Sequence, residues 1–313
     1  MSFDTIEKKG FKEGFWSDEE IKEIFLDKQR RIIWNKDYWR NILVPLFKLN
    51  QNSVILDVGC GLGFIGQSLA EFVPEGKIIG VDLDTKLVEL AQRISAKTVP
   101  NRDFNYRVGS AYKLPVESNS ADLSICQCML MHLDDPAKAI AEMQRVTKKG
   151  GRVVAIEPDY ASVSYFDTAV QEMNYSINQR ADFLRWEMIR KLGKKKLGKG
   201  DDDIGTKLPF LFYKVGLRLV EVRTFDRVFW LVPPYKREGN DIELEQVLLS
   251  PEFYMEKLGT HEEFLTSGGT EEEFKEYFDL LRKEHKVRQR QVREKTYVSS
   301  VTQALIIAIG EKA

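Results

Sequence analysis

The sequence predicts an α/β fold with a doubly wound, mostly parallel sheet of seven strands. Three observations carry this prediction. Short apolar runs alternate with helical patterns between residues 54 and 156, a glycine-rich turn follows the first run, and an apolar strand stands near the end of the chain. Parallel strands need crossover connections, usually helices, so this alternation indicates a parallel sheet covered on both faces.

The composition is that of a folded protein with balanced charge. Of 313 residues, 43% are hydrophobic and 30% charged, which is enough apolar material for a core. The 47 Lys and Arg against 48 Asp and Glu give a net charge of −1, whereas binders of nucleic acid or anionic membranes usually carry a basic surplus. We therefore expect neither nucleic acid nor a membrane as a partner.

The cysteines and the N-terminus predict the compartment. Three cysteines cannot build a disulfide framework, which favours a reducing environment. The N-terminus, MSFDTIEKKG, lacks the apolar stretch of a signal peptide, and no run approaches the ~20 apolar residues of a membrane span. We expect a soluble cytoplasmic protein; nothing in the sequence indicates an oligomer.

The N-terminal segment, residues 1–49, is predicted to be helical. Ser17 followed by Glu20 fits a capping box, and the apolar residues behind it recur at helical spacing. A second helix is expected over about 35–49, with Pro45 as a kink. We expect this segment to form a lid.

Five strands and the helices between them follow in order. The first strand is a short apolar run. Asp84 is a plausible N-cap, and Pro136 lies in the first turn of a predicted helix, where proline is favoured. The predicted strands are 54–58, 77–81, 104–108, 121–125 and 151–156, and the predicted helices are 64–72, 84–95 and 136–147.

Beyond residue 157 the pattern becomes mostly helical. One long helix is predicted over about 162–192. Residues 238–297 again look helical, and Thr270 with Glu273 forms a second capping box.

The last two strands are predicted at 217–224 and 303–309, the final one antiparallel. These patterns divide the chain into four parts: an N-terminal helical lid (1–49), a core with a helical segment at about 160–200 (50–232), a helical insertion that caps the substrate (233–298) and a final core strand (299–313).

The segment that carries chemistry is VILDVGCGLGFIG, residues 54–66. A strand runs into a glycine-rich turn and then a helix, and glycines permit positive φ and close approach of a ligand. In doubly wound sheets, ligands bind at the carboxyl ends of the strands. Asp82 ends the next strand, where its carboxylate can accept hydrogen bonds from two ribose hydroxyls. The sequence therefore predicts a nucleoside-containing ligand.

Two kinds of nucleoside ligand compete. Gly61, Gly63 and Gly66, with an acid about 20 residues on, also match the dinucleotide fingerprint, so a nicotinamide-dependent oxidoreductase is an alternative. Asp57 favours another ligand, because its carboxylate would repel a pyrophosphate and suits a cationic amino-acid end.

Five motifs stand in order over about residues 50–159: LDVGCGLG, GVDLD, RVGSAYKLP, ADLSICQ and KKGGRVVAIEP. This set resembles the class I S-adenosylmethionine-dependent methyltransferases, in particular the ubiquinone/menaquinone-biosynthesis type. The resemblance implies a Rossmann-like fold and an enzyme that methylates a small-molecule acceptor. It also implies S-adenosyl-L-methionine as cofactor and S-adenosyl-L-homocysteine as product.

The resemblance further implies which residues bind the cofactor. They lie in the glycine turn and at the ends of the following strands: Asp57, Gly59, Cys60, Gly61, Gly63, Asp82, Leu83, Ser110, Ala111 and Gln127. The turn would surround the methionine part and ribose, and Gln127 would face the methionine end. Asp82 would hold the ribose hydroxyls, with Leu83 against the adenine. Ser110 and Ala111 would lie at the adenine edge, where many relatives carry an aspartate in place of Ser110.

A catalytic residue is harder to identify. Methyl transfer from a sulfonium is an in-line displacement, which needs alignment and a base only when the acceptor must lose a proton. His132, after the fourth strand, is the candidate, and a structural histidine is the alternative. The three histidines are scattered, so no metal site is predicted. A non-catalytic binder of the same cofactor is the second alternative to an enzyme.

Overall fold

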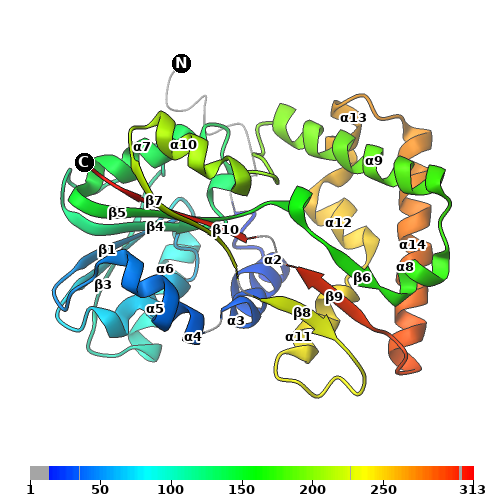
Figure 1. Ribbon diagram of the computed structural model, residues 1–313, viewed down its shortest axis with the longest axis horizontal. Coiled ribbons are helices and arrows are strands. Elements are labelled where there is room, and N and C mark those ends of the chain that lie inside the picture. Colours follow the sequence, from blue (N-terminus) through cyan, green and yellow to red (C-terminus); the bar gives the residue numbers. More distant parts are fainter. Residues whose placement is uncertain (1–13, 35, 226, 303–304) are drawn as a thin grey trace. The chain divides into compact units, whose positions relative to one another are not determined.

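The computed structural model describes residues 14–34, 36–225, 227–302 and 305–313 (Figure 1). These residues form two compact units. The first, called the sheet unit, holds residues 14–161, 202–225 and 305–313. The second, called the helical unit, holds 162–201 and 227–302.

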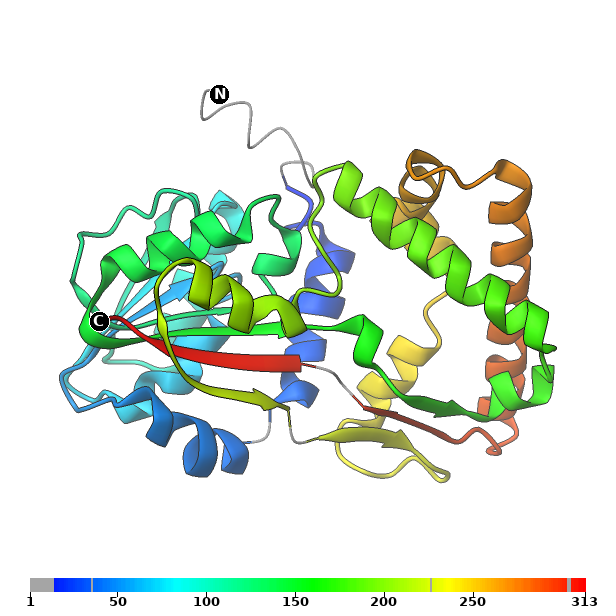
Figure 2. The same cartoon turned by 45° about the horizontal axis from the view of Figure 1, so that its top comes forward.

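The sheet unit contains the predicted seven-stranded sheet, in the order β3-β2-β1-β4-β5-β10-β7. Along the sheet, the neighbouring strands β3, β2, β1, β4 and β5 are parallel. Strand β10 lies between β5 and β7 and runs antiparallel to both (Figure 2). The fold class and the antiparallel last strand are thus confirmed; of the predicted strand 303–309, residues 303 and 304 lie outside the described residues. The strands are β1 (Val54–Val58), β2 (Lys77–Asp82), β3 (Asp103–Val108), β4 (Ala121–Gln127), β5 (Thr147–Pro158), β7 (Arg218–Thr224) and β10 (Leu305–Glu311).

Helices cover both faces of this sheet, as the alternation predicted (Figure 1). Leu56 and Val58 of β1 belong to the apolar core that also holds residues of α7 and α10. Because side chains alternate along a strand, Asp57 points to the other face, toward α5. The helices of the sheet unit after the N-terminal segment are α5 (Phe64–Leu69), η4 (Ala70–Phe72), α6 (Thr85–Thr98), η5 (Leu130–His132), α7 (Pro136–Val146), η7 (Gly205–Lys207) and α10 (Leu208–Lys214), and η6 (Tyr160–Ser162) follows β5 at the boundary between the units.

The strand order creates the place where a ligand can bind. From β1 the chain continues outward to β2 and β3, and it then returns to place β4 on the other side of β1. The connection after β1 therefore leads toward β2, whereas the connection after β4 leads in the opposite direction, toward β5. Such a switch point is where open α/β sheets bind their ligands.

The described part of the N-terminal segment is helical, as predicted. Asp18, rather than the predicted Ser17, caps the first helix: its Oδ1 accepts hydrogen bonds from the backbone N–H groups of Glu20 and Ile21. The Ser17 hydroxyl instead donates to the carbonyl of Gly14. The elements are α2 (Glu19–Ile21), the π-helix η1 (Lys22–Lys28), α3 (Gln29–Ile33), α4 (Lys36–Tyr38), η2 (Trp39–Leu43) and η3 (Val44–Phe47), while residues 1–13 of the predicted lid lie outside the described residues.

The prediction of one long helix over 162–192 is wrong. A strand and two helices occupy this range, because polar side chains cap new helix starts inside it. Asp167 caps α8 by accepting from the N–H of Ala169 at 2.8 Å. Asn174 then takes a left-handed conformation, with φ of 47°, and Ser176 forms a capping box that begins α9.

The helical unit combines a three-stranded antiparallel sheet, in the order β6-β9-β8, with six helices in its described residues. The predicted helical character of 238–297 and the Thr270–Glu273 capping box are confirmed. The elements are β6 (Tyr165–Asp167), α8 (Thr168–Met173), α9 (Ile177–Lys196), β8 (Val228–Leu231), α11 (Asn240–Val247), α12 (Pro251–Leu258), α13 (Thr260–Thr266), α14 (Glu271–Arg293) and β9 (Ser299–Thr302).

The two units divide the chain differently from the predicted parts, since residues 227–232 and 299–302, which were predicted as core, lie in the helical unit. Residues 162–201 group with the later helices and not with the sheet. The reason is an aromatic cluster in which Trp186 of α9 packs with Phe264 of α13 and Tyr277 of α14. Among the helices that the structure describes, none is long and apolar enough to cross a membrane.

Candidate cofactor-binding site

A glycine turn joins β1 to α5 at the carboxyl edge of the sheet. Gly59, Gly61 and Gly63 have φ values of 69°, 52° and 78°, which other residues rarely adopt. A Cβ on Gly59 would lie 2.4 Å from Cγ of Met129, and one on Gly63 would lie 2.3 Å from the Tyr106 hydroxyl. A Cβ on Gly61 would meet only Leu26, at 3.8 Å. Gly61 is therefore the position of the turn that a ligand can approach without displacing the sheet unit's core.

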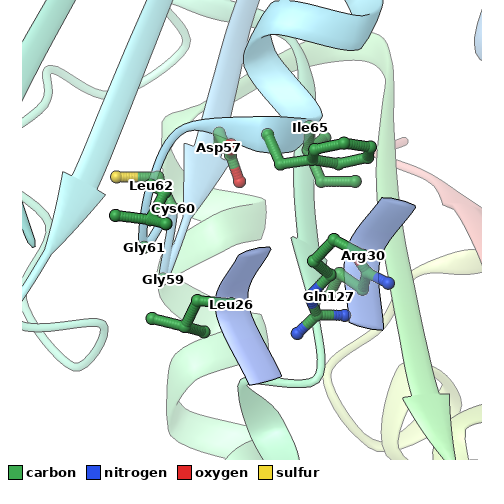
Figure 3. A pocket seen from close by; sticks show the side chains of 10 residues that line it. Leu26, Arg30, Asp57, Gly59, Cys60, Gly61, Leu62, Ile65 and Gln127 are labelled. Atoms are coloured by element: carbon green, nitrogen blue, oxygen red, sulfur yellow. The ribbon is translucent and has the colours of Figure 1, made fainter. Parts of the chain in front are cut away.

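A small cavity of about 30 Å³ lies beside this turn (Figure 3). It is large enough for one or two water molecules. Leu26 and Arg30, from η1 and α3, lie opposite the turn and fill the space above it. The lining residues are Leu26, Arg30, Asp57, Gly59, Cys60, Gly61, Leu62, Phe64, Ile65 and Gln127.

Asp57 places a buried carboxylate in this cavity. It is 2% exposed, and its Oδ2 accepts a hydrogen bond from the backbone N–H of Gly66 at 3.2 Å. Burial raises the pKa of Asp57 to about 7, and the Asp82 carboxylate also raises it. The Gly66 N–H and the Arg30 guanidinium act in the opposite direction. A cation bound in the cavity would stabilise the ionised form of Asp57.

The raised pKa of Asp57 predicts how stability depends on pH. A carboxyl whose pKa is higher in the folded chain contributes stability below its unfolded pKa, and this is lost as pH rises through about 7. Asp57→Asn keeps the shape and removes the titration. We expect the variant to have a higher free energy of unfolding than the native chain at about pH 8, with the difference vanishing toward about pH 4.

Urea denaturation across that pH range measures this difference. Asp103→Asn is the control, because Asp103 is exposed and pairs with Lys77 at the surface. Parallel pH profiles for Asp57→Asn and the native chain would show that Asp57 does not titrate in the expected range.

Asp82 holds the glycine turn from the neighbouring strand. Its Oδ2 accepts from the N–H of Gly61 at 2.8 Å, and its Oδ1 accepts from the N–H of Asp84 at 3.0 Å. Burial raises the pKa of Asp82, and these N–H groups oppose the rise. A carboxylate offers about four lone-pair positions, so it can accept from ligand hydroxyls as well as from these N–H groups. Leu83, the next residue, is 60% exposed and offers an apolar surface beside them.

Gln127 contributes a buried donor without a partner. It ends β4, is 6% exposed and lines the cavity. Its Nε2 has no hydrogen-bond partner among the residues that the structure describes. Buried polar atoms are nearly always hydrogen-bonded, so an unpaired one that lines a cavity indicates a ligand that completes the bond.

The remaining predicted residues lie outside the cavity lining. Ser110 and Ala111 follow β3, and Ser110 Oγ accepts from the N–H of Tyr112 at 3.2 Å. The ring of His132 packs against Trp16, with ring centroids 4.6 Å apart. Of the predicted cofactor residues, the structure brings together Asp57, Gly59, Cys60, Gly61 and Gln127 at the cavity and joins Asp82 to them through Gly61.

The described residues contain no cluster of side chains that could bind a metal ion. No group of three or more His, Cys, Asp or Glu side chains lies there in a position to hold a metal ion.

Sequence reasoning missed Leu26 and Arg30. Both line the cavity, and they stand four residues apart, one helical turn. Helical spacing was visible in the sequence, but it does not tell which face of an N-terminal helix meets a distant glycine turn.

Sequence reasoning also missed Glu157, which lies one residue before the end of β5 and is fully buried. Its carboxylate accepts from the N–H groups of Met129, Leu130 and Met131 at 3.0, 2.9 and 3.2 Å. Burial raises its pKa to about 7, against these N–H groups and Arg30. Glu157 thereby holds the turn after β4, which keeps Met129 against Gly59. An acidic residue at the carboxyl end of a central strand was the available signal.

Comparisons with known proteins find similarity to methyltransferases. Residues 49–199 match a family model described as a methyltransferase domain. An uncharacterised methyltransferase of Schizosaccharomyces pombe is 40% identical over 117 residues, 36% of this chain and 42% of that protein. A demethylmenaquinone methyltransferase of Lactococcus lactis is 31% identical over 164 residues, 50% of this chain and 65% of that protein. The chain spans about half the length of the curated relatives it matches.

A solved structure agrees with the fold. It is a putative methyltransferase from Bacillus halodurans, with a TM-score of 0.51 and 17% sequence identity. The match covers 87% of this chain and 99% of that one. At this identity the likeness concerns the fold alone.

Proposed function

We propose that this chain, which is similar to methyltransferases over residues 49–199, transfers a methyl group from S-adenosylmethionine to a small-molecule acceptor. The observation that carries the proposal is the buried carboxylate of Asp57 beside the glycine turn. A negative charge there disfavours a pyrophosphate and favours a ligand with a cationic amino-acid end. The matches to methyltransferases support the same choice over a nicotinamide-dependent oxidoreductase.

The residues present fit such a cofactor. When bound, S-adenosylmethionine supplies a methyl group on a cationic sulfur that is a good leaving group. Asp57 would bind the ammonium of its amino-acid end, and Gln127 would donate its unpaired N–H to that end. Asp82 would accept from the two ribose hydroxyls, with Leu83 against the adenine. Ser110 and Ala111 would lie at the adenine edge, and His132 stays the proposed candidate for a base.

The cavity is smaller than the cofactor requires. Pockets for small molecules usually measure about 300–1,000 Å³, whereas this one measures about 30 Å³. Leu26 lies directly above Gly61. Cofactor binding therefore requires Leu26 and Arg30 to move, and we propose that the N-terminal helices act as the lid that the sequence predicted.

Turnover tests the proposed function. The purified chain would be incubated with S-adenosylmethionine carrying a deuterated methyl group and with the small-molecule fraction of a cell extract. We expect mass spectrometry to find a small molecule that gains the labelled methyl group. Firm binding of S-adenosylhomocysteine without any labelled product would favour the non-catalytic binder instead.

Asp82→Ala is expected to weaken cofactor binding by about 10- to 150-fold. The variant removes the charged acceptor for the ribose hydroxyls, and a hydrogen bond to a charged group contributes about 1.5–3 kcal/mol. Isothermal calorimetry with S-adenosylhomocysteine measures the change.

Asp84→Ala is the matched control for this variant. Asp84 caps α6 through the N–H groups of Lys86 and Leu87, so its loss costs about 1 kcal/mol of stability while the Asp82 carboxylate stays in place. Unchanged affinity in a folded Asp82→Ala variant would remove the ribose assignment.

A further inference from the structure

We propose that Arg30 binds the carboxylate of the cofactor's amino-acid end, so that the N-terminal helix completes the cofactor site. This inference rests on the proposed function and assigns a role to a residue outside the predicted motifs. It names the chemical group that Arg30 recognises, an α-carboxylate next to an ammonium.

Arg30 is placed for this role by four residues near the carboxyl ends of three strands. It lines the cavity together with Asp57 of β1 and Gln127 of β4 (Figure 3). Its Nη1 donates to Sγ of Cys128, just beyond β4, at 3.4 Å. Its charge also acts on Glu157 at the end of β5. The guanidinium therefore lies at the carboxyl edge of the sheet, where the cofactor's methionine end is expected.

The charges of the cavity are complementary to an amino acid. Asp57 provides a carboxylate and Arg30 a cation in the same small space, and the ammonium and carboxylate of the cofactor form the opposite pair. A guanidinium presents its donors in a planar fork that matches a carboxylate bidentately. Gln127 Nε2 adds a neutral donor of the kind that the same carboxylate accepts.

The bond that Arg30 makes in this structure is a weak one. A thiol is a poor acceptor, whereas a hydrogen bond between a guanidinium and a carboxylate is strong and charge-assisted. Exchange of Cys128 for a cofactor carboxylate would therefore hold Arg30, and with it the helix that carries Leu26, in a cofactor-bound position. The purely structural alternative is that Arg30 only neutralises Asp57 and Glu157.

A pair of ligands that differ by one carboxylate separates these roles. The probes are S-adenosylmethionine and decarboxylated S-adenosylmethionine, titrated into the native chain and into Arg30→Gln. We expect the native chain to prefer the carboxylate-bearing ligand by about 10- to 150-fold, and the variant to lose this preference. In Arg30→Gln the affinity for the decarboxylated ligand should fall much less than that for S-adenosylmethionine, whereas a merely structural role weakens both alike.

Two further variants complete the test. Arg40→Gln is the matched control, because Arg40 lies on the same N-terminal segment, is exposed and pairs with Glu71. It should leave both affinities unchanged. Arg30→Lys keeps the charge without the fork, so it should retain part of the preference, and it replaces Arg30→Gln if thermal unfolding shows that the glutamine variant does not fold.

The outcomes distinguish this inference from the proposed function. A native chain that binds neither ligand overturns both. A native chain that binds the two equally, or equal weakening of both ligands in Arg30→Gln, overturns the role of Arg30 and leaves the proposed function standing. An unchanged preference in Arg30→Gln, or in Arg30→Lys where that variant replaces it, overturns the role of Arg30 as well.

Discussion

Replacing Gly61 by valine is expected to abolish binding of S-adenosylmethionine and S-adenosylhomocysteine in a chain that still folds. A Cβ at Gly61 meets no atom of the sheet unit closer than Leu26, 3.8 Å away. The valine side chain would therefore enter the space above the turn, which the proposed cofactor must occupy. Its φ of 52° adds backbone strain of about 1–2 kcal/mol, which lowers stability without unfolding a typical domain.

A control with equal strain and no ligand contact is available at Gly150. This glycine has a φ of 75°, and a Cβ there would meet nothing within 4 Å. Gly150→Val should lower the unfolding midpoint about as much as Gly61→Val while binding S-adenosylhomocysteine like the native chain. Calorimetry and thermal unfolding on both variants measure the two effects separately. Retained binding in Gly61→Val would mean that no ligand passes over this turn.

The second large effect is expected from Glu157→Ala. The variant leaves three N–H groups, of Met129, Leu130 and Met131, without their common acceptor in a buried place. Each unsatisfied buried donor costs about 1–3 kcal/mol, and single substitutions rarely cost more than about 5 kcal/mol in total, so the free energy of unfolding should fall by about 3–5 kcal/mol. Release of Met129 from its place against Gly59 should also weaken cofactor binding. Urea denaturation measures the first effect, and calorimetry measures the second.

Glu157→Gln is the matched comparison. Its amide oxygen can still accept, but its NH₂ group would face a donor, so we expect an intermediate loss of stability. If Glu157→Ala were as stable as the native chain, the turn after β4 would have to be held by other contacts.

Much of the fold could be predicted from the sequence, because the sheet depends on local patterns. Most core strands contain a short apolar run, and the caps at Asp84 and Thr270 are side-chain-to-backbone bonds within three residues. The prediction of one long helix over 162–192 was wrong, and its failure also has a local cause. Asn174 tolerates a left-handed conformation and Ser176 caps a new helix, so both break a pattern that apolar spacing alone would continue.

The sequence predicted only those residues of the candidate site that belong to the motifs at the strand ends. Asp57 and Gln127 stand at the carboxyl ends of central strands, so the topology alone brings them to one edge. Leu26 and Arg30 meet this edge through tertiary packing of the N-terminal helices, which no local pattern specifies. The sequence offered His132 as a candidate base, with a structural histidine as the alternative, and the structure places its ring against Trp16, outside the cavity lining.

The most direct test of the account is a calorimetric titration of the native chain with S-adenosylhomocysteine and, separately, with NADH. We predict saturable binding of S-adenosylhomocysteine at one site, weakened by Asp82→Ala, and no binding of NADH. Saturable binding of NADH together with no response to S-adenosylhomocysteine would contradict the account.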